Sequence, residues 1–295
     1  MPASTKYLFV VLDVLLLAAL TTLNAAEPPL PRSAPSSEDQ VHKVASRQDV
    51  LIIGASSLNS PVPQARLVEA MLASSGIQMN FDSKFPDLDA VDELLKTKDK
   101  WDFVVLDAWH LGRTKADWGK GSSSVPADFP KAMARFVKEV RVHSPECKII
   151  LFPWWIPGGP KATKEGAMEV FQSCVETGKS NRIWVATTGP AFMEALLDRP
   201  DLHITKSKTD GHPGKEGAYL NACSLYAIIA GKTPVGLPAT LSLAVAEGKK
   251  EDFTIADADA KYLQELTWKI YQREIKNTKP SKITRQHGLG CENQV

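Results

Sequence analysis

A short apolar run that ends in a turn of small residues constrains the fold of this chain more than any other feature. Residues 50–53 read Val-Leu-Ile-Ile, and Gly54 follows them directly. A strand that is apolar on both faces is typical of the centre of a parallel sheet covered by helices on each side. Residues 55–57 are Ala, Ser and Ser, which let the backbone turn sharply at the carboxyl end of the strand. Open α/β sheets bind their ligands at this end, although a purely structural turn explains the stretch equally simply.

Strand and helix patterns alternate along the rest of the chain. Apolar residues recur at helical spacing after each predicted strand, and Gly76 and Gly231 supply the C-terminal stops of two helices. The predicted strands are 50–53, 77–81, 101–106, 148–152 and 183–186, and the helices between and after them centre on 67–72, 88–95, 133–140, 168–175 and 216–230. Five strands separated by helices indicate an α/β fold with a five-stranded parallel sheet and right-handed crossovers.

The first residues have the layout of a secretory signal peptide. Lys6 precedes an apolar run from Tyr7 to Leu23, and small residues at Ala25 and Ala26 suit cleavage. An uncleaved membrane anchor is the alternative. Asp13 interrupts the apolar run, however, and a charge inside so short a run disfavours a membrane-spanning helix. We therefore expect a secreted or periplasmic protein with no membrane contact after cleavage. The predicted organisation is a signal peptide at 1–26, a Pro/Ser-rich linker at 27–47, one folded domain at 48–276 and a polar tail at 277–295.

The balance of charge and the spacing of the cysteines argue against nucleic-acid binding, membrane-surface binding and a cysteine metal site. The chain carries 35 Lys and Arg residues against 34 Asp and Glu residues, so no overall field favours nucleic acid or a membrane surface. The four cysteines, Cys147, Cys174, Cys223 and Cys291, lack metal-ligand spacing. The first three sit beside apolar neighbours and are predicted to be buried free thiols. No metal or other cofactor is expected.

Polar and aromatic residues follow two of the predicted central strands. Asp107 and Trp109 come directly after strand 101–106, and Trp154 and Trp155 come directly after strand 148–152. Flat indole faces beside a site suit sugar rings, whose C–H groups pack on them. These four residues are therefore predicted to bind substrate. The alternative for Trp154 and Trp155 is that they only cover the core.

A late loop carries the groups that a serine nucleophile needs. Asp210 and His212 lie in the loop before the helix that ends at Gly231. A serine after the first strand together with an Asp and a His in one late loop would supply the nucleophile, the orienting carboxylate and the general base. The predicted catalytic residues are therefore Ser56, His212 and Asp210.

Two segments resemble the sequence blocks of the SGNH/GDSL hydrolases, secreted bacterial members in particular. IIGASSLNS (52–60) is similar to their first block, in which Ser56 would be the nucleophile. DGHPGKEGAYLNACSLYAIIAGKTP (210–234) is similar to their last block, in which a His followed by Pro is the base. The resemblance covers most of the domain, including a closing helix, AKYLQELTWKIY (260–271). It implies a three-layer α/β/α sandwich of flavodoxin-like type and ester hydrolysis without a metal.

Three positions depart from the pattern of that family. Ala55 stands where the family often has Asp or Asn, and Asp210 lies two residues before the histidine instead of three. Residues 107–110 replace the Gly-x-Asn-Asp block, whose Asn donates to the oxyanion. A carboxylate at Asp107 would oppose a developing oxyanion unless it is protonated or turned away.

Two functional classes stay open. The first is a secreted serine esterase of SGNH type that removes acetyl groups from a carbohydrate, acting on a small-molecule or polysaccharide ester. The second is a non-catalytic carbohydrate-binding protein on a degenerate SGNH fold, which the missing oxyanion donors favour. Covalent labelling of Ser56 separates the two.

Overall fold

The structure is a computed structural model that describes residues 47–54, 56–84, 91–108, 126–153, 163–207, 209–246 and 248–280. The predicted signal peptide, nearly all of the linker and most of the polar tail lie outside these residues. Their boundaries, and those of the domain, stay predictions. Among the described helices, none is long and apolar enough to cross a membrane.

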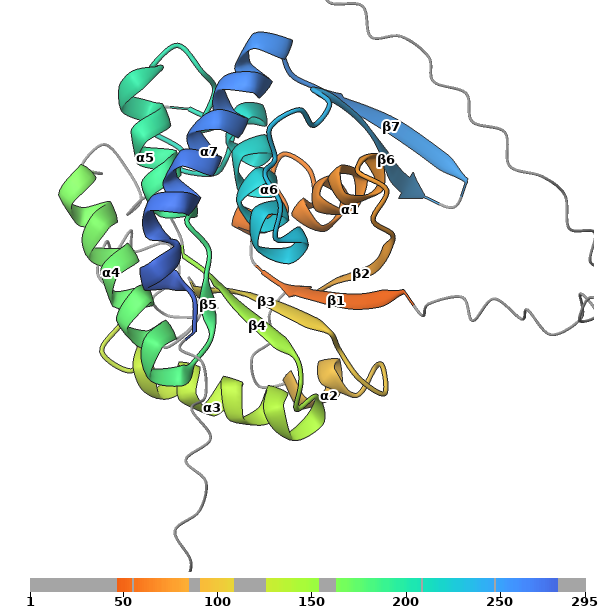
Figure 1. Ribbon diagram of the computed structural model, residues 1–295, viewed down its shortest axis with the longest axis vertical. Coiled ribbons are helices and arrows are strands. Elements are labelled where there is room, and N and C mark those ends of the chain that lie inside the picture. Colours follow the sequence, from red (N-terminus) through yellow and green to blue (C-terminus); the bar gives the residue numbers. More distant parts are fainter. Residues whose placement is uncertain are drawn as a thin grey trace, which may run out of the picture. The chain divides into compact units, whose positions relative to one another are not determined.

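Five parallel strands form the central sheet in the order β2-β1-β3-β4-β5 (Figure 1). The strands are β1 (Gln48–Ile53), β2 (Met79–Lys84), β3 (Phe103–Asp107), β4 (Lys148–Phe152) and β5 (Trp184–Val185). This order is the flavodoxin-like one, in which β1 lies between β2 and β3 and the strand order reverses beside it. The predicted five-stranded parallel sheet is therefore confirmed.

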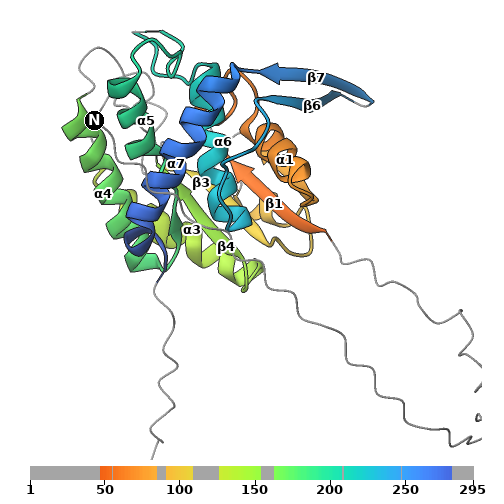
Figure 2. The same cartoon turned by 45° about the horizontal axis from the view of Figure 1, so that its top comes forward.

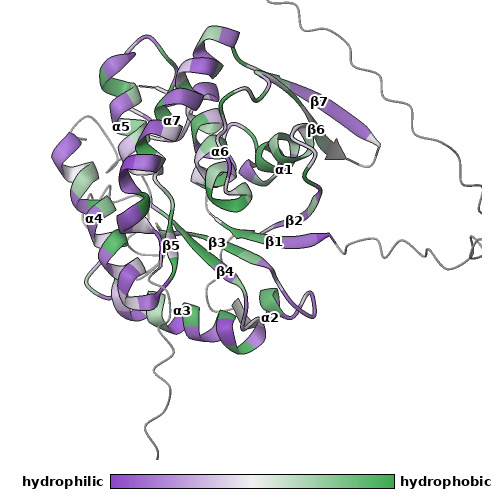
Figure 3. Ribbon diagram, viewed as in Figure 1, coloured by the Kyte–Doolittle hydropathy of each residue, from purple (hydrophilic) through white to green (hydrophobic). Residues whose placement is uncertain are grey.

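Side chains of β1 alternate between two hydrophobic clusters, which explains why the strand is apolar throughout. Val50 and Ile52 belong to one cluster, and Leu51 and Ile53 belong to the other. Because successive side chains of a strand point to opposite faces, a strand covered on both sides needs apolar residues at every position. Figure 3 shows this as a hydrophobic sheet between helices whose outer faces are hydrophilic.

Helices cover both faces of the sheet and complete the predicted α/β/α sandwich (Figures 1 and 2). The cluster of Leu51 and Ile53 joins the sheet to the helices of the first face, and the cluster of Val50 and Ile52 joins it to the helices of the second face. The first face carries α2 (Val91–Leu95), α3 (Phe129–His143) and α4 (Lys164–Asn181). The second carries α1 (Gln64–Ser74), α5 (Thr188–Asp198), α6 (Lys215–Ala230) and α7 (Asp257–Thr278).

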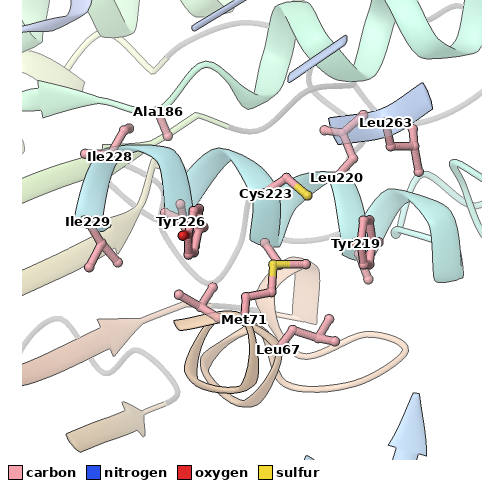
Figure 4. Close-up of a cluster of buried hydrophobic side chains, with 14 of the residues drawn as sticks. Leu67, Met71, Ala186, Tyr219, Leu220, Cys223, Tyr226, Ile228, Ile229 and Leu263 are labelled. Carbon is pink, nitrogen blue, oxygen red and sulfur yellow. The ribbon is translucent and has the colours of Figure 1, made fainter. Parts of the chain in front are cut away.

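Helix α6 is the most buried helix of the second face. Figure 4 shows Tyr219 and Tyr226 on the side of α6 that faces α1, while Leu220 lies beside Leu263 of α7. Nearly every side chain from Gly217 to Ile229 is buried, which explains the absence of a polar stripe in its sequence. The helix ends where predicted, because Gly231 adopts the left-handed conformation of a C-terminal cap. A helix anchored in this way gives a rigid base to the loop that precedes it.

Two elements lie outside the predicted pattern. Helix α5 follows β5 directly, and a two-stranded antiparallel hairpin of β6 (Thr240–Ala246) and β7 (Lys249–Thr254) lies between α6 and α7. The hairpin is a separate sheet. Its buried side chains, Leu241 and Phe253 among them, belong to the same cluster as α1 and α6.

The described cysteines are free thiols, and two of the three are buried as predicted. Cys174 and Cys223 are buried and Cys147 is half-buried, while Cys291 lies outside the described residues. Burial, together with the charge of Asp102, raises the pKa of the Cys147 thiol to about 12. Burial also raises the pKa of the other two thiols, so all three are unreactive at neutral pH.

Candidate active site

Ser56 lies on a single 3-10 turn at the carboxyl end of β1. This turn, η1 (Ser56–Leu58), is closed by a hydrogen bond from the Asn59 N–H to the Ser56 carbonyl at 3.1 Å. Gly54 is required before it, because a Cβ there would lie within 3 Å of three side-chain atoms of Leu58. Leu58 is buried in the core, so it anchors the turn while Ser56 stays exposed.

The loop of Asp210 and His212 is fixed by hydrogen bonds to the chain that precedes it. The Lys206 N–H donates to the His212 carbonyl at 2.7 Å, and the Gly214 N–H donates to the Ile204 carbonyl at 3.0 Å. These two backbone hydrogen bonds hold the loop against the preceding segment. The backbone of His212, just before α6, is therefore fixed in position.

Close packing explains why a glycine, Gly217, stands in the segment after His212. A Cβ at this position would lie 2.0 Å from the carbonyl oxygen of Ile204, which is a backbone atom that cannot turn aside. The first turn of α6 therefore packs directly on the backbone that leads into the loop. Tyr219, two residues later, donates its hydroxyl to the Pro238 carbonyl at 3.0 Å.

The three predicted catalytic side chains lie in a hydrogen-bonded row. Ser56 Oγ is 2.8 Å from His212 Nε2, and His212 Nδ1 is 2.6 Å from Asp210 Oδ1. Each distance is within the hydrogen-bonding range, and the imidazole bridges the two groups as in a Ser-His-Asp triad. The row joins the end of β1 to a loop 156 residues further along the chain.

The two-residue spacing between Asp210 and His212 is accommodated by a local turn. Asp210 Oδ1 accepts the backbone N–H of His212 at 3.0 Å as well as the ring Nδ1. An aspartate that accepts the amide two residues ahead forms an Asx turn, which brings the two side chains to the same side. The carboxylate therefore reaches Nδ1 without the third residue that the family pattern has.

Asp210 is held in its ionised form. The backbone and ring hydrogen bonds from His212 hold the pKa of its carboxyl below the ordinary value, although partial desolvation opposes them. Lys206 adds a weaker contribution, with its Nζ 3.6 Å from Asp210 Oδ2. About a third of the Asp210 side chain and 42% of the His212 side chain are exposed. An ionised carboxylate here fixes the imidazole tautomer with the proton on Nδ1 and leaves Nε2 to accept a proton from Ser56.

The structure places only one of the predicted substrate-binding residues. Asp107, at the end of β3, is 1% exposed, and its Oδ2 accepts the Ser57 hydroxyl. Its carboxylate therefore faces the turn of Ser56 and not an open surface. Trp109, Trp154 and Trp155 lie outside the described residues, so their predicted roles stay predictions.

The sequence indicates no role for Ser57, although the Ser57 hydroxyl donates to Asp107 Oδ2. Two adjacent serines in a small-residue turn give no sign of which one faces solvent and which one faces the sheet. Within the described part of the chain, no group of three or more His, Cys, Asp or Glu side chains is arranged to hold a metal ion.

Comparison with known proteins gives structural similarity alone. No protein-family model matches the sequence, and no curated protein matches it significantly. Among solved structures, the chain is similar to a protein described as a GDSL-like lipase from Parabacteroides merdae, with 14% identity over 62% of this chain and 95% of that one, at a TM-score of 0.47. It is also similar to phospholipase A1 from Streptomyces albidoflavus, with 11% identity over 63% and 100% of the two chains, at a TM-score of 0.45.

A third similar structure is a variant of an acetyl xylan esterase from Geobacillus stearothermophilus, with 16% identity over 60% of this chain and 92% of that one, at a TM-score of 0.43. The assignment of the fold rests on the topology of the chain itself. Its strands follow the flavodoxin-like order, and helices cover both faces of the sheet. By this topology the chain has a flavodoxin-like three-layer α/β/α fold.

Proposed function

We propose that this protein is a serine esterase of SGNH type. Ser56 is the nucleophile, His212 the general acid and base, and Asp210 the group that orients the imidazole. One observation carries the proposal: Ser56, His212 and Asp210 form a continuous row of two hydrogen bonds, 2.8 and 2.6 Å long. Such a row activates a hydroxyl that is otherwise a weak nucleophile.

The reaction follows from the positions of the protons. Ser56 Oγ attacks the ester carbonyl while Nε2 of His212 takes the hydroxyl proton, and Asp210 stabilises the imidazolium that forms. The tetrahedral intermediate collapses when His212 returns that proton to the departing alcohol, leaving an acyl group on Ser56. Water then attacks the acyl-enzyme with His212 as base, and the products are the free acid and the regenerated serine.

The oxyanion needs donors other than the Asn of the family pattern. The first backbone N–H groups of a helical turn lack a partner within the turn. The amides of Ser56 and Ser57 open η1 and are the donors that we assign to this role. Backbone N–H groups that the turn holds in place before the charge develops would need little reorganisation.

Acetylated carbohydrate is the substrate class that we propose, as a small-molecule or polysaccharide ester. Ser56 is exposed, and in the sequence Trp109 follows strand β3 while Trp154 and Trp155 follow strand β4, which offers flat indole faces for sugar rings. Export by the predicted signal peptide would bring the enzyme to such substrates. Mass spectrometry of exported protein should then find a chain that begins near Ala26 or Glu27.

A carbohydrate-binding protein without catalysis is the second candidate. The observation that favours it is Asp107, because a carboxylate stands in the strand end where the family pattern has its donating Asn. An acceptor in that place gives no help to an oxyanion.

Covalent labelling with a fluorophosphonate tests the proposed function. The wild-type protein should be labelled at Ser56, and Ser56→Ala should abolish the label. Ser83→Ala is the matched control, because Ser83 lies in the neighbouring strand β2 outside the row and its loss should leave labelling intact. Unlabelled wild-type protein that binds acetylated xylan or mannan would instead establish the binding function.

A further inference from the structure

The carboxylate of Asp107 is buried beneath the turn that carries Ser56. Asp107 is the last residue of β3, which pairs directly with β1 in register Ile53↔Leu106. The side chain is 1% exposed, and its Oδ2 accepts the hydroxyl of Ser57. Burial of a carboxylate destabilises the fold unless hydrogen bonds satisfy the carboxylate, so the bond from Ser57 helps to stabilise Asp107 in this position.

Ser57 is the residue directly after the nucleophile. Because η1 contains only Ser56, Ser57 and Leu58, a bond that fixes one side chain of the turn fixes the direction of its neighbours. Leu58 anchors the turn to the core, because it belongs to the same buried cluster as residues of α1 and α6. Ser57 anchors the turn to the end of β3. With both anchors in place, Ser56 is the residue of the turn that is left exposed.

We propose that Ser57 and Asp107 form a positioning pair that holds Ser56 Oγ within reach of His212 Nε2. This inference rests on the proposed esterase function and assigns two side chains, the Ser57 hydroxyl and the Asp107 carboxylate, that act through Ser56 without touching substrate. It replaces the substrate-binding role predicted for Asp107. The distance of 2.8 Å between Ser56 and His212 depends on where the turn sits, because the imidazole is fixed independently by its own loop.

The charge of Asp107 and its hydrogen bond have separable effects. An amide at this position keeps an acceptor oxygen for the Ser57 hydroxyl and removes the charge. Removal of the Ser57 hydroxyl deletes the hydrogen bond and leaves the carboxylate. If the pair acts through one bond, the two changes must not add when they are combined.

A double-mutant cycle on a simple acetyl ester tests the pair, with Ser57→Ala, Asp107→Asn and the double variant. For Ser57→Ala we expect kcat to fall about 10- to 100-fold, because a small displacement of a reacting group is costly. KM should change by less than about threefold, since no substrate contact is lost. The rate of fluorophosphonate labelling should fall in parallel with kcat. Asp107→Asn should cost less than Ser57→Ala, and the double variant should be no worse than Ser57→Ala.

Ser83→Ala serves as the matched control, and thermal unfolding checks that each variant is folded. Wild-type kcat in Ser57→Ala would overturn the positioning role, and so would additive losses in the double variant. A raised KM with unchanged kcat would mean that the pair contacts substrate. Wild-type protein that neither hydrolyses the ester nor labels would instead remove the proposed function, and the positioning role with it.

Discussion

His212 and Asp210 are joined twice, although they are only two residues apart. Asp210 Oδ1 accepts both the backbone N–H of His212, at 3.0 Å, and its ring Nδ1, at 2.6 Å. One oxygen thus fixes the backbone turn and the imidazole together. The short spacing therefore does not prevent a triad, because the turn that it creates is the same turn that orients the base.

Asp210→Asn should reduce kcat/KM by about 10³- to 10⁴-fold, because an amide can no longer hold the productive imidazole tautomer. The temperature of unfolding should fall by less than about 4 °C, since partly exposed ion pairs contribute little. Asp201→Asn is the control, because Asp201 is an exposed carboxylate paired with Arg199 at 2.6 Å. Steady-state kinetics on both variants measure the difference. A loss of less than about tenfold in Asp210→Asn would mean that another group orients His212.

The carboxyl of Asp210 should add no ionisation to the pH dependence of hydrolysis between pH 5 and 9. Hydrogen bonds from His212 hold the pKa of Asp210 below its ordinary value, so the carboxylate stays charged over this whole range. A plot of log kcat/KM against pH should therefore have a limiting slope of no more than about one on its acid side. A slope of about two would require Asp210 or another second group to titrate there.

The same lowering of the Asp210 pKa affects the free energy of unfolding at acid pH. A carboxyl whose pKa is lowered by folding stabilises the protein above its unfolded value, 3.8. That contribution is lost as the pH falls through the folded value. Urea unfolding should therefore show no effect of Asp210→Asn on the pH dependence of stability between pH 5 and 9, and a difference only below about pH 4.

Gly217→Ala should destabilise the fold and displace the catalytic loop. The added methyl would lie 2.0 Å from the Ile204 carbonyl oxygen, so backbone must move. We expect a loss of about 1–3 kcal/mol in the free energy of unfolding, together with reduced kcat/KM, because the displaced segment leads to His212. Gly189→Ala in α5 is the matched control: its methyl would meet Phe171 at an ordinary 3.7 Å. Equal stability of the two variants would contradict the close packing at Gly217.

Lys148→Met should change how stability depends on alkaline pH. Lys148 Nζ donates to the Ile228 carbonyl at 2.5 Å and lies 4.2 Å from the centroid of the Trp184 ring. Burial, together with the charge of Lys279, lowers the pKa of Lys148 to about 8 from 10.5. Between these values the unfolded chain binds more protons, so this residue makes the wild type more stable as the pH rises.

Urea unfolding at pH 7 and at pH 10 measures that effect. The stability of the wild type relative to Lys148→Met should increase between the two values. Lys276→Met near the end of α7 is a control for the general effect of removing a lysine. An equal response of the two variants to pH would show that the environment of Lys148 does not shift its ionisation.

Local patterns predicted several elements closely. The strand expected at 148–152 is β4 with the same bounds, and the helix expected to end at Gly231 does so. An apolar run and a left-handed glycine act within a few residues, so a sequence shows them directly. Helix α5 and the hairpin of β6 and β7 were not predicted from the sequence. The hairpin depends on packing of residues such as Leu241 and Phe253 against distant helices, which local propensity does not register.

The sequence by itself determined the alternation of strands and helices, the turn after β1 and the loop of His212. These features follow from the spacing of apolar residues and from the positions of Gly and Pro. Only the tertiary structure decided the partner of each polar group. Asp107 accepts the Ser57 hydroxyl because the register of β3 against β1 buries the end of one strand beneath the turn of the other. That register is a contact between residues about fifty positions apart, and it is set by the packing of both faces of the sheet.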